Sequence, residues 1–113
     1  MPVRVLIVDD DAPTRSVLIK VLRAEGCDAT GTGSGAEALE LLRAAPYDVL
    51  VTDQVMPEMT GFELISASRT LDYPLRRIII SGAQRPEHTL PDDVAWLTKP
   101  LDADLLLEAI RAP

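Results

Sequence analysis

Short apolar runs rich in valine and isoleucine alternate along this chain with longer segments that have helical spacing. The runs cover residues 3–8, 49–52, 78–80 and 95–98, and a weaker one covers residues 27–31. Strands that alternate with helices indicate βαβ units, and strands that are apolar throughout indicate a parallel sheet buried on both faces. Right-handed crossovers leave few ways to connect such strands. The pattern therefore predicts an α/β fold with a doubly wound, five-stranded parallel sheet.

Four segments have apolar residues at helical spacing, and we expect helices at residues 13–25, 36–44, 61–70 and 103–111. Pro13 suits a first helical turn, and Gly26 suits the left-handed position just after a helix end. Asp102 is placed to cap the last helix. The apolar residues expected to share the inward helix faces are Val17, Leu18, Val21, Leu22, Leu39, Leu42, Phe62, Ile65, Leu106 and Ile110.

The stretch between residues 80 and 95 breaks this pattern. It contains Pro86 and Pro91, and Pro91 would interrupt a helix because it lacks the backbone N–H and clashes with the preceding turn. We expect a short turn or an irregular loop in place of a fourth helix. The only histidine, His88, lies in this stretch and is expected to be a surface residue.

The composition narrows the class of protein. A chain of 113 residues suits one domain, expected to span residues 1–113. The net charge is −7 and the basic residues form only short pairs such as Arg76-Arg77, so nucleic-acid binding is not expected. The single cysteine, Cys27, is expected to be a buried strand residue, and the first apolar run is too short for a signal peptide or membrane span. We therefore expect a cytoplasmic protein without membrane contacts.

Polar or charged residues directly follow four of the apolar runs. The first run is followed by Asp9, Asp10 and a third aspartate, and the next strong run by Asp53. The last two are followed by Ser81 and Lys99. In an open α/β sheet, ligands bind beside the carboxyl ends of the strands. We therefore expect these side chains to meet at one edge of the sheet.

Crowded carboxylates favour a cation at that edge. At about 5 Å and an effective dielectric constant near 20, each charged pair costs roughly 3 kcal/mol. Mg²⁺ takes oxygen ligands and neutralises phosphoryl groups, which would leave an aspartate free to attack phosphorus. Each residue alone has a plainer interpretation: Asp11 is expected to cap a helix, Lys99 suits a surface charge, and Ser81 suits a turn. Their combination at one edge favours the functional interpretation.

Four segments of the chain resemble the motifs of bacterial response-regulator receiver domains. They are residues 5–11 (VLIVDDD), 49–53 (VLVTD, followed by Met56-Pro57 and Gly61), 78–83 (IIISGA) and 97–101 (LTKPL). The resemblance covers essentially the whole chain. It implies a flavodoxin-like, CheY-like fold with strand order 2-1-3-4-5. It also implies a signalling switch that accepts a phosphoryl group from a histidine kinase or histidine phosphotransfer protein, rather than an enzyme with a separate substrate.

The resemblance assigns roles at the predicted metal site. Asp53 would be the phosphoacceptor. Asp10 would bind Mg²⁺ directly, Asp9 would hold it mainly through water, and the backbone carbonyl of Val55 would supply a further ligand.

Further roles follow from the same resemblance. Ser81 and Lys99 would contact the phosphoryl oxygens, and Ser81 would move as a switch residue. Trp96 lies where the family often has a tyrosine or phenylalanine that changes rotamer with the switch, although a half-buried packing residue is the alternative interpretation. The family also predicts a cis peptide bond between Lys99 and Pro100.

Two departures from the family pattern carry information. The stretch from Ser81 to Lys99 is short, and the deletion falls on the fourth helix, as in receivers of hybrid histidine kinases and some single-domain regulators. That helix is half of the surface that many receivers use for dimerisation and output, so the usual dimer mode is not expected. Because the sequence contains no effector domain, output is expected to occur by protein–protein contact. Val55 replaces a polar residue that the family often has two positions after the phosphoacceptor. We therefore expect metal binding through the backbone to be kept and the rate of dephosphorylation to differ.

Three alternatives remain open from the residues. A phosphatase of the haloacid dehalogenase type would need Asp-x-Asp-x-Thr; Asp9 and Asp11 fit, but Pro13 occupies the threonine position. A flavodoxin-like carrier would need a phosphate loop after Val8, where the aspartates would repel a phosphate. A protein that keeps the receiver fold without phosphorylation is the third alternative, and the retained site residues argue against it.

Overall fold

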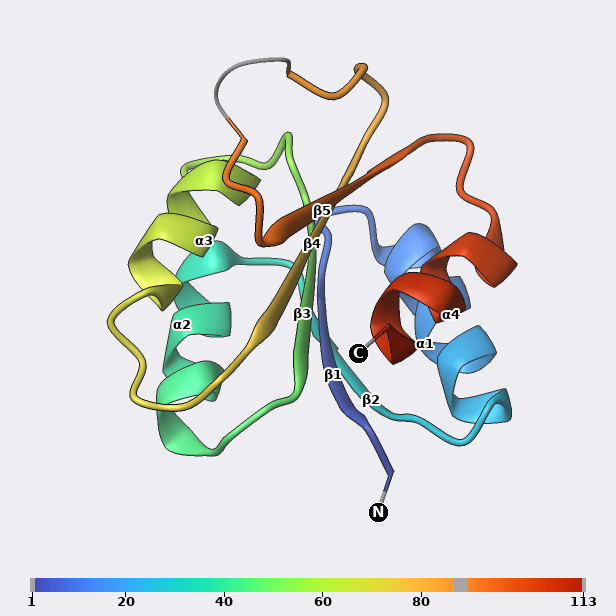
Figure 1. Cartoon of the computed structure of the whole chain (residues 1–113), viewed down its shortest axis with the longest axis horizontal. Coiled ribbons are helices and arrows are strands. Elements are labelled where there is room, and N and C mark those ends of the chain that lie inside the picture. The colour runs from blue at the N-terminus through green and yellow to red at the C-terminus, as the bar shows by residue number, and fades with distance from the viewer. Residues whose placement is uncertain (1, 87–89, 113) are drawn as a thin grey trace.

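The computed structural model describes residues 2–86 and 90–112, which form alternating strands and helices (Figure 1). The strands are β1 (Arg4–Val8), β2 (Asp28–Thr32), β3 (Val49–Asp53), β4 (Arg76–Ser81) and β5 (Val94–Thr98). The helices are α1 (Ala12–Ala24), α2 (Gly35–Ala44), α3 (Gly61–Ser68) and α4 (Ala103–Arg111). Among these described helices, none combines the length and the apolar character needed to cross a bilayer.

All five strands pair in parallel in the order β2-β1-β3-β4-β5, which confirms the predicted doubly wound sheet. Val8 lies opposite Thr52, and Asp53 lies opposite Ile80. The carboxyl ends of β1, β3 and β4 are therefore neighbours in space. The strand order reverses between β1 and β3, which is where the residues after β1 meet the end of β3.

Two helical layers cover the sheet. Helices α1 and α4 lie on one face, and α2 and α3 lie on the other (Figure 1). Alternate residues of β1 point to opposite faces, as a strand requires. Val5 and Ile7 join the core beneath α1 and α4, whereas Leu6 and Val8 join the core beneath α2 and α3. Both faces of the sheet are thus buried, in agreement with the uniformly apolar runs.

The helix termini follow local capping chemistry. Asp11 accepts a hydrogen bond from the Thr14 N–H at 3.0 Å, and Asp102 accepts one from the Asp104 N–H at 2.8 Å. Both predicted caps are confirmed, and Gly26 has the predicted left-handed φ of +88°. Such caps satisfy backbone N–H groups that have no partner inside the helix. Each predicted helix boundary lies within two residues of the observed one.

The predictions for Val17, Val21 and Cys27 need correction. Val17 was expected to face inward, but it is 59% exposed because α1 contacts the sheet through Leu18 and Leu22, a spacing of one helical turn. Val21 is only half-buried. Cys27 is buried as expected, but it lies just before β2 rather than within it.

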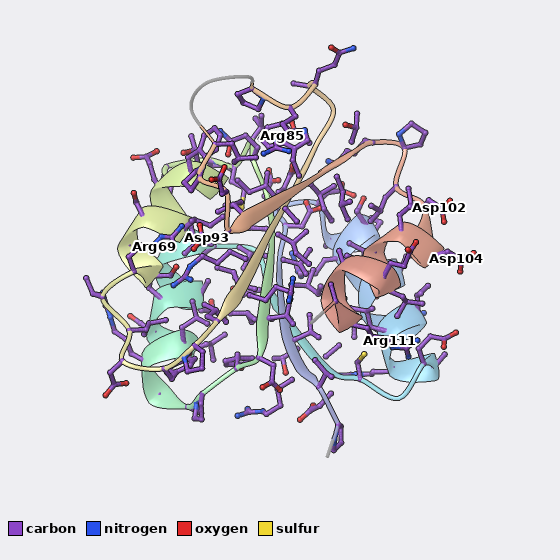
Figure 2. The ribbon with its side chains drawn as sticks, in the orientation of Figure 1. Arg69, Arg85, Asp93, Asp102, Asp104 and Arg111 are labelled. Atoms are coloured by element: carbon purple, nitrogen blue, oxygen red, sulfur yellow. The ribbon has the colours of Figure 1, made fainter. Side chains whose placement is uncertain are left out.

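The connection from β4 to β5 contains no helix in its described parts, residues 82–86 and 90–93, as predicted. His88 lies outside the described residues. The end of this connection is tied to α3 by a two-contact ion pair between Arg69 and Asp93, with Nη2 to Oδ1 at 2.8 Å (Figure 2). Side-chain pairing with α3 thus anchors the chain just before it enters β5.

Strand β4 begins two residues before the predicted run and carries a buried arginine. Arg77 is 8% exposed, and its guanidinium donates to the Ser68 hydroxyl at 2.8 Å, the Ser68 carbonyl at 3.1 Å and the Leu75 carbonyl at 3.0 Å. Burial lowers the pKa of this group. The end of α3 is therefore joined to β4 through a desolvated cation.

Replacement of this arginine should destabilise the fold strongly. Arg77→Ala removes the donor to the Leu75 carbonyl and to the Ser68 hydroxyl, leaves the Ser68 carbonyl with only the Leu71 N–H, and opens a cavity, at an expected cost of about 3 kcal/mol. Arg43→Ala, at an exposed position in the last turn of α2, should cost less than about 0.5 kcal/mol. Urea unfolding of both variants measures the difference, and equal stabilities would contradict this role of Arg77.

Candidate metal centre at the carboxyl edge of the sheet

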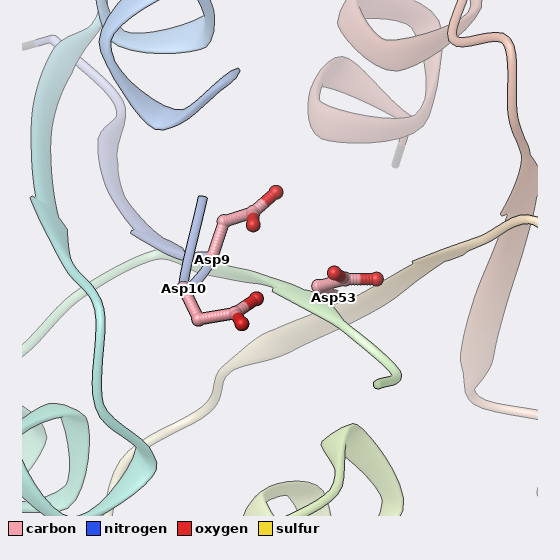
Figure 3. A group of neighbouring side chains, drawn as sticks. All are labelled: Asp9, Asp10 and Asp53. Carbon is pink, nitrogen blue, oxygen red and sulfur yellow. The ribbon is translucent and has the colours of Figure 1, made fainter. Parts of the chain in front are cut away.

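Three aspartates converge where β1 and β3 end. Asp9 and Asp10 follow β1, Asp53 is the last residue of β3, and each offers a carboxylate oxygen within 4.8 Å of the other two (Figure 3). Asp9 and Asp53 are buried, whereas Asp10 is exposed. The predicted convergence is therefore observed, with one ligand position open to solvent.

The surroundings of Asp9 disfavour its ionised form. Burial, more than any other effect, raises the pKa of Asp9, and the neighbouring Asp53 raises it further. A hydrogen bond from the Asp11 N–H to Asp9 Oδ1, at 2.9 Å, acts in the opposite direction because it stabilises the carboxylate.

Lys99 supplies the positive charge on the other side of Asp53. Its Nζ lies 3.4 Å from Asp53 Oδ1, and its backbone N–H donates to the Ser81 carbonyl at 2.7 Å. The predicted cis peptide bond between Lys99 and Pro100 is present. Lys99, which directly follows β5, therefore places its amine beside Asp53, the candidate phosphoacceptor.

The donor set suits Mg²⁺. Three carboxylates provide the hard oxygen ligands that this ion prefers, and the exposure of Asp10 leaves room for the waters that Mg²⁺ usually keeps. The carbonyl oxygen of Val55 accepts no hydrogen bond from the described residues, so it is free to act as a ligand. The three carboxylates are thus compatible with the ion, and the Val55 carbonyl remains a predicted ligand.

Ser81 and Trp96 are linked through one residue. Ser81 is 2% exposed, and its Oγ accepts a hydrogen bond from the Ala83 N–H at 3.1 Å. Trp96 Nε1 donates to the Ala83 carbonyl at 3.1 Å, and its half-buried ring lies 5.9 Å from that of Phe62. A movement of Ser81 would therefore disturb the residue that holds the indole.

The sequence patterns missed two residues that support the site, Gln54 and Arg15. Gln54 Oε1 accepts a hydrogen bond from the Phe62 N–H at 2.9 Å, so it fixes the start of α3 against the end of β3. Gly61 permits this approach, because a Cβ there would lie 2.6 Å from the Asp53 carbonyl oxygen. Arg15 Nη1 donates to the Asp9 carbonyl at 2.6 Å. The only sequence signals were a polar residue directly after Asp53 and a basic residue in the first helix.

Comparison with known proteins supports the resemblance. Residues 5–111 match the family model described as "Response regulator receiver domain". The response regulator receiver protein CpdR of Brucella abortus is 38% identical, over 96% of this chain and 93% of that protein. The chemotaxis response regulator CheY4 of Vibrio cholerae has a TM-score of 0.84 at 28% identity, over 98% of each chain. The receiver domain of the hybrid histidine kinase CckA has a TM-score of 0.79 at 30% identity, over 96% and 95%.

The chain belongs to the response regulator receiver family. It is a phosphorylation-dependent switch of two-component signalling, with the CheY-like form of the flavodoxin-like fold. Family membership replaces the phosphatase and electron-carrier alternatives.

Removal of the buried charge of Asp9 should stabilise the metal-free protein. The raised pKa means that the folded state binds a proton more tightly than the unfolded chain, so stability is lost as pH rises from about 3.9 through the folded-state value. At pH 7, Asp9→Asn should therefore raise the melting temperature of the metal-free protein. The exposed control Asp72→Asn should have little effect.

Addition of Mg²⁺ provides the matching control. The ion should raise the melting temperature of the unmodified protein and of Asp72→Asn, and should raise that of Asp9→Asn less. Calorimetry with and without Mg²⁺ measures both effects. A drop in the melting temperature of metal-free Asp9→Asn would contradict the assigned repulsion.

Proposed function

We propose that Asp53 accepts the phosphoryl group and that Asp9, Asp10, Asp53 and the Val55 carbonyl hold Mg²⁺. The observation that carries this proposal is the meeting of three carboxylates within 4.8 Å, with the Lys99 amine 3.4 Å from Asp53. A phosphoryl group on Asp53 would lie between a divalent cation and an amine. Both would neutralise its charge.

The transfer is a displacement at phosphorus. A carboxylate oxygen of Asp53 attacks the phosphorus of a phosphohistidine, and the P–O bond forms as the P–N bond breaks. The imidazole nitrogen leaves with the electron pair and later takes up a proton. Lys99 pairs with a phosphoryl oxygen and orients it. Mg²⁺ held by the carboxylates would further neutralise the phosphoryl oxygens.

The donor is proposed to be a histidine kinase or a histidine phosphotransfer protein. An apolar pocket of about 450 Å³ opens beside the carboxylates and is lined by Asp9, Lys99, Pro13, Val17 and Leu101 among others. Of the site residues, Asp9 and Lys99 line this pocket, so a donor side chain seated there would lie beside them. We further propose that residues 1–113 form one cytoplasmic receiver domain that catalyses only its own phosphoryl transfer and slow dephosphorylation. Its output is an unidentified downstream protein rather than nucleic acid or a membrane.

The switch is proposed to pass through Ala83. The Ser81 hydroxyl now accepts from the Ala83 N–H, and it would instead donate to a phosphoryl oxygen on Asp53. Loss of that contact frees the Ala83 backbone, whose carbonyl holds the Trp96 indole. The surface near β5 and α3 would then repack.

Phosphorylation of Asp53 can be tested by mass. Incubation with a small acyl phosphate and Mg²⁺ should add one phosphoryl group to the intact protein, and removal of Mg²⁺ with a chelator should prevent it. Asp53→Asn should show no adduct because an amide oxygen is a poor nucleophile. Asp72→Asn should be modified normally. An adduct on Asp53→Asn would refute the assignment, and no adduct on the unmodified protein would favour a fold retained without phosphorylation.

The switch can be followed by fluorescence, because Trp96 is the only tryptophan in the sequence. Phosphorylation should change its emission as the Ala83 contact is lost. Ser81→Ala should remain phosphorylated but show a much smaller change, because its side chain cannot donate to the phosphoryl group. The exposed Ser66→Ala serves as a control and should respond normally. An unchanged response in Ser81→Ala would remove Ser81 from the switch.

A further inference from the structure

Arg15 reaches from α1 across the carboxyl end of β2 to the backbone of the metal site. Its Nη1 donates to the Asp9 carbonyl at 2.6 Å. Two glycines leave the path open. A Cβ on Gly31 would lie 3.0 Å from the Arg15 side-chain carbons, and a Cβ on Gly33 would lie 3.0 Å from Nη1. The Arg15 side chain therefore packs against two positions that lack a side chain, Gly31 in β2 and Gly33 just after β2; a Cβ on Gly31 would also lie 2.6 Å from Ile19 Cδ1.

Asp9 is held at three different atoms. Its N–H donates to the Thr32 carbonyl at 3.1 Å, and its Oδ1 accepts from the Asp11 N–H at 2.9 Å. The guanidinium of Arg15 completes the set at the carbonyl oxygen. Because that carbonyl belongs to the peptide bond joining Asp9 to Asp10, the contact also restrains the orientation of this peptide plane.

Asp10 depends on this restraint more than its neighbours do. Its carboxylate is exposed and has no hydrogen-bond partner among the described residues. Asp9 and Asp53, by contrast, are buried and bonded. The location of the Asp10 carboxylate is therefore set by its backbone, which begins at the peptide that Arg15 holds.

We propose that Arg15 is a positioning residue for the Mg²⁺ site, which fixes the Asp9–Asp10 peptide so that both carboxylates face Asp53. The inference rests on the proposed function, since it assigns a further residue to the same metal site. Arg15 touches neither the ion nor the phosphoryl group in this role; it acts through the backbone of the ligands.

If Arg15 acted only through its positive charge, its replacement would change Mg²⁺ affinity in the opposite direction. Arg15 is a cation near the carboxylate cluster, so its removal would strengthen Mg²⁺ binding if the residue acted only through Coulomb repulsion of the ion. A positioning role predicts weaker binding, because loss of an outer contact that orients a ligand typically lowers metal affinity about 10- to 100-fold. The sign of the change separates the two explanations.

The test is a Mg²⁺ titration of the full chain, followed by the backbone amide chemical shifts of the site. Arg15→Met should weaken binding by about tenfold, and Arg15→Lys should recover part of the loss because an ammonium can donate to the same carbonyl. Arg23→Met is the matched control. Arg23 lies on the same helix and donates to the Ala29 carbonyl from Nε at 3.1 Å and Nη2 at 2.9 Å, away from the carboxylates. It should lower stability without changing Mg²⁺ affinity.

Gly33→Ala tests the same contact without removing a charge. The added methyl group would lie 3.0 Å from Nη1 and push the guanidinium a few tenths of an ångström from its place, so affinity should fall by less than in Arg15→Met, and the combination with Arg15→Met should be no worse than Arg15→Met alone. This variant also decides the matter if Arg15→Met does not fold. Unchanged or tighter binding in both variants would overturn the positioning role. Absence of Mg²⁺ binding by the unmodified protein would instead overturn the proposed function.

Discussion

Mutual repulsion among three carboxylates at the end of β1 and β3 is the constraint around which the functional edge of this protein is organised. Their oxygens lie within 4.8 Å of one another, and two of the three residues are buried. Lys99 offsets part of this charge from one side, and the proposed Mg²⁺ would offset the rest. The cluster is tolerated because the sheet beneath it is buried against apolar side chains on both faces, and this burial supplies stability that offsets the repulsion at the site.

The short connection between β4 and β5 shapes the other side of the site. In its described parts no helix covers the sheet; instead, the Arg69–Asp93 pair ties the chain to α3. Trp96 is bonded to Ala83 and lies against Phe62. These contacts place both proposed switch residues, Ser81 and Trp96, on a single backbone link. A change at Asp53 would thus reach the surface around Trp96 through Ser81 and Ala83.

The fold and the main site residues were predictable because each strand carries its own signal. A strand buried on both faces must be apolar throughout, and a polar residue after such a strand must lie at the sheet edge. Strand ends and inward faces were less predictable. The pattern missed Arg77 because a buried arginine is tolerated only where acceptors such as the Ser68 hydroxyl and carbonyl, on another element, are brought to it by the fold. It misplaced Val17 because the rotation of a helix about its axis is set by packing.

The sequence alone determined the order of the motifs along the chain and the capping residues Asp11 and Asp102. It also determined which aspartates follow β1 and end β3. Each of these features arises from neighbours within a few positions. Tertiary structure alone decided that Arg15 reaches the Asp9 carbonyl past Gly33, and that Lys99 lies 3.4 Å from Asp53. Those contacts join elements whose distance from each other depends on how the helices and strands pack. The spacing of residues along the chain does not determine that distance.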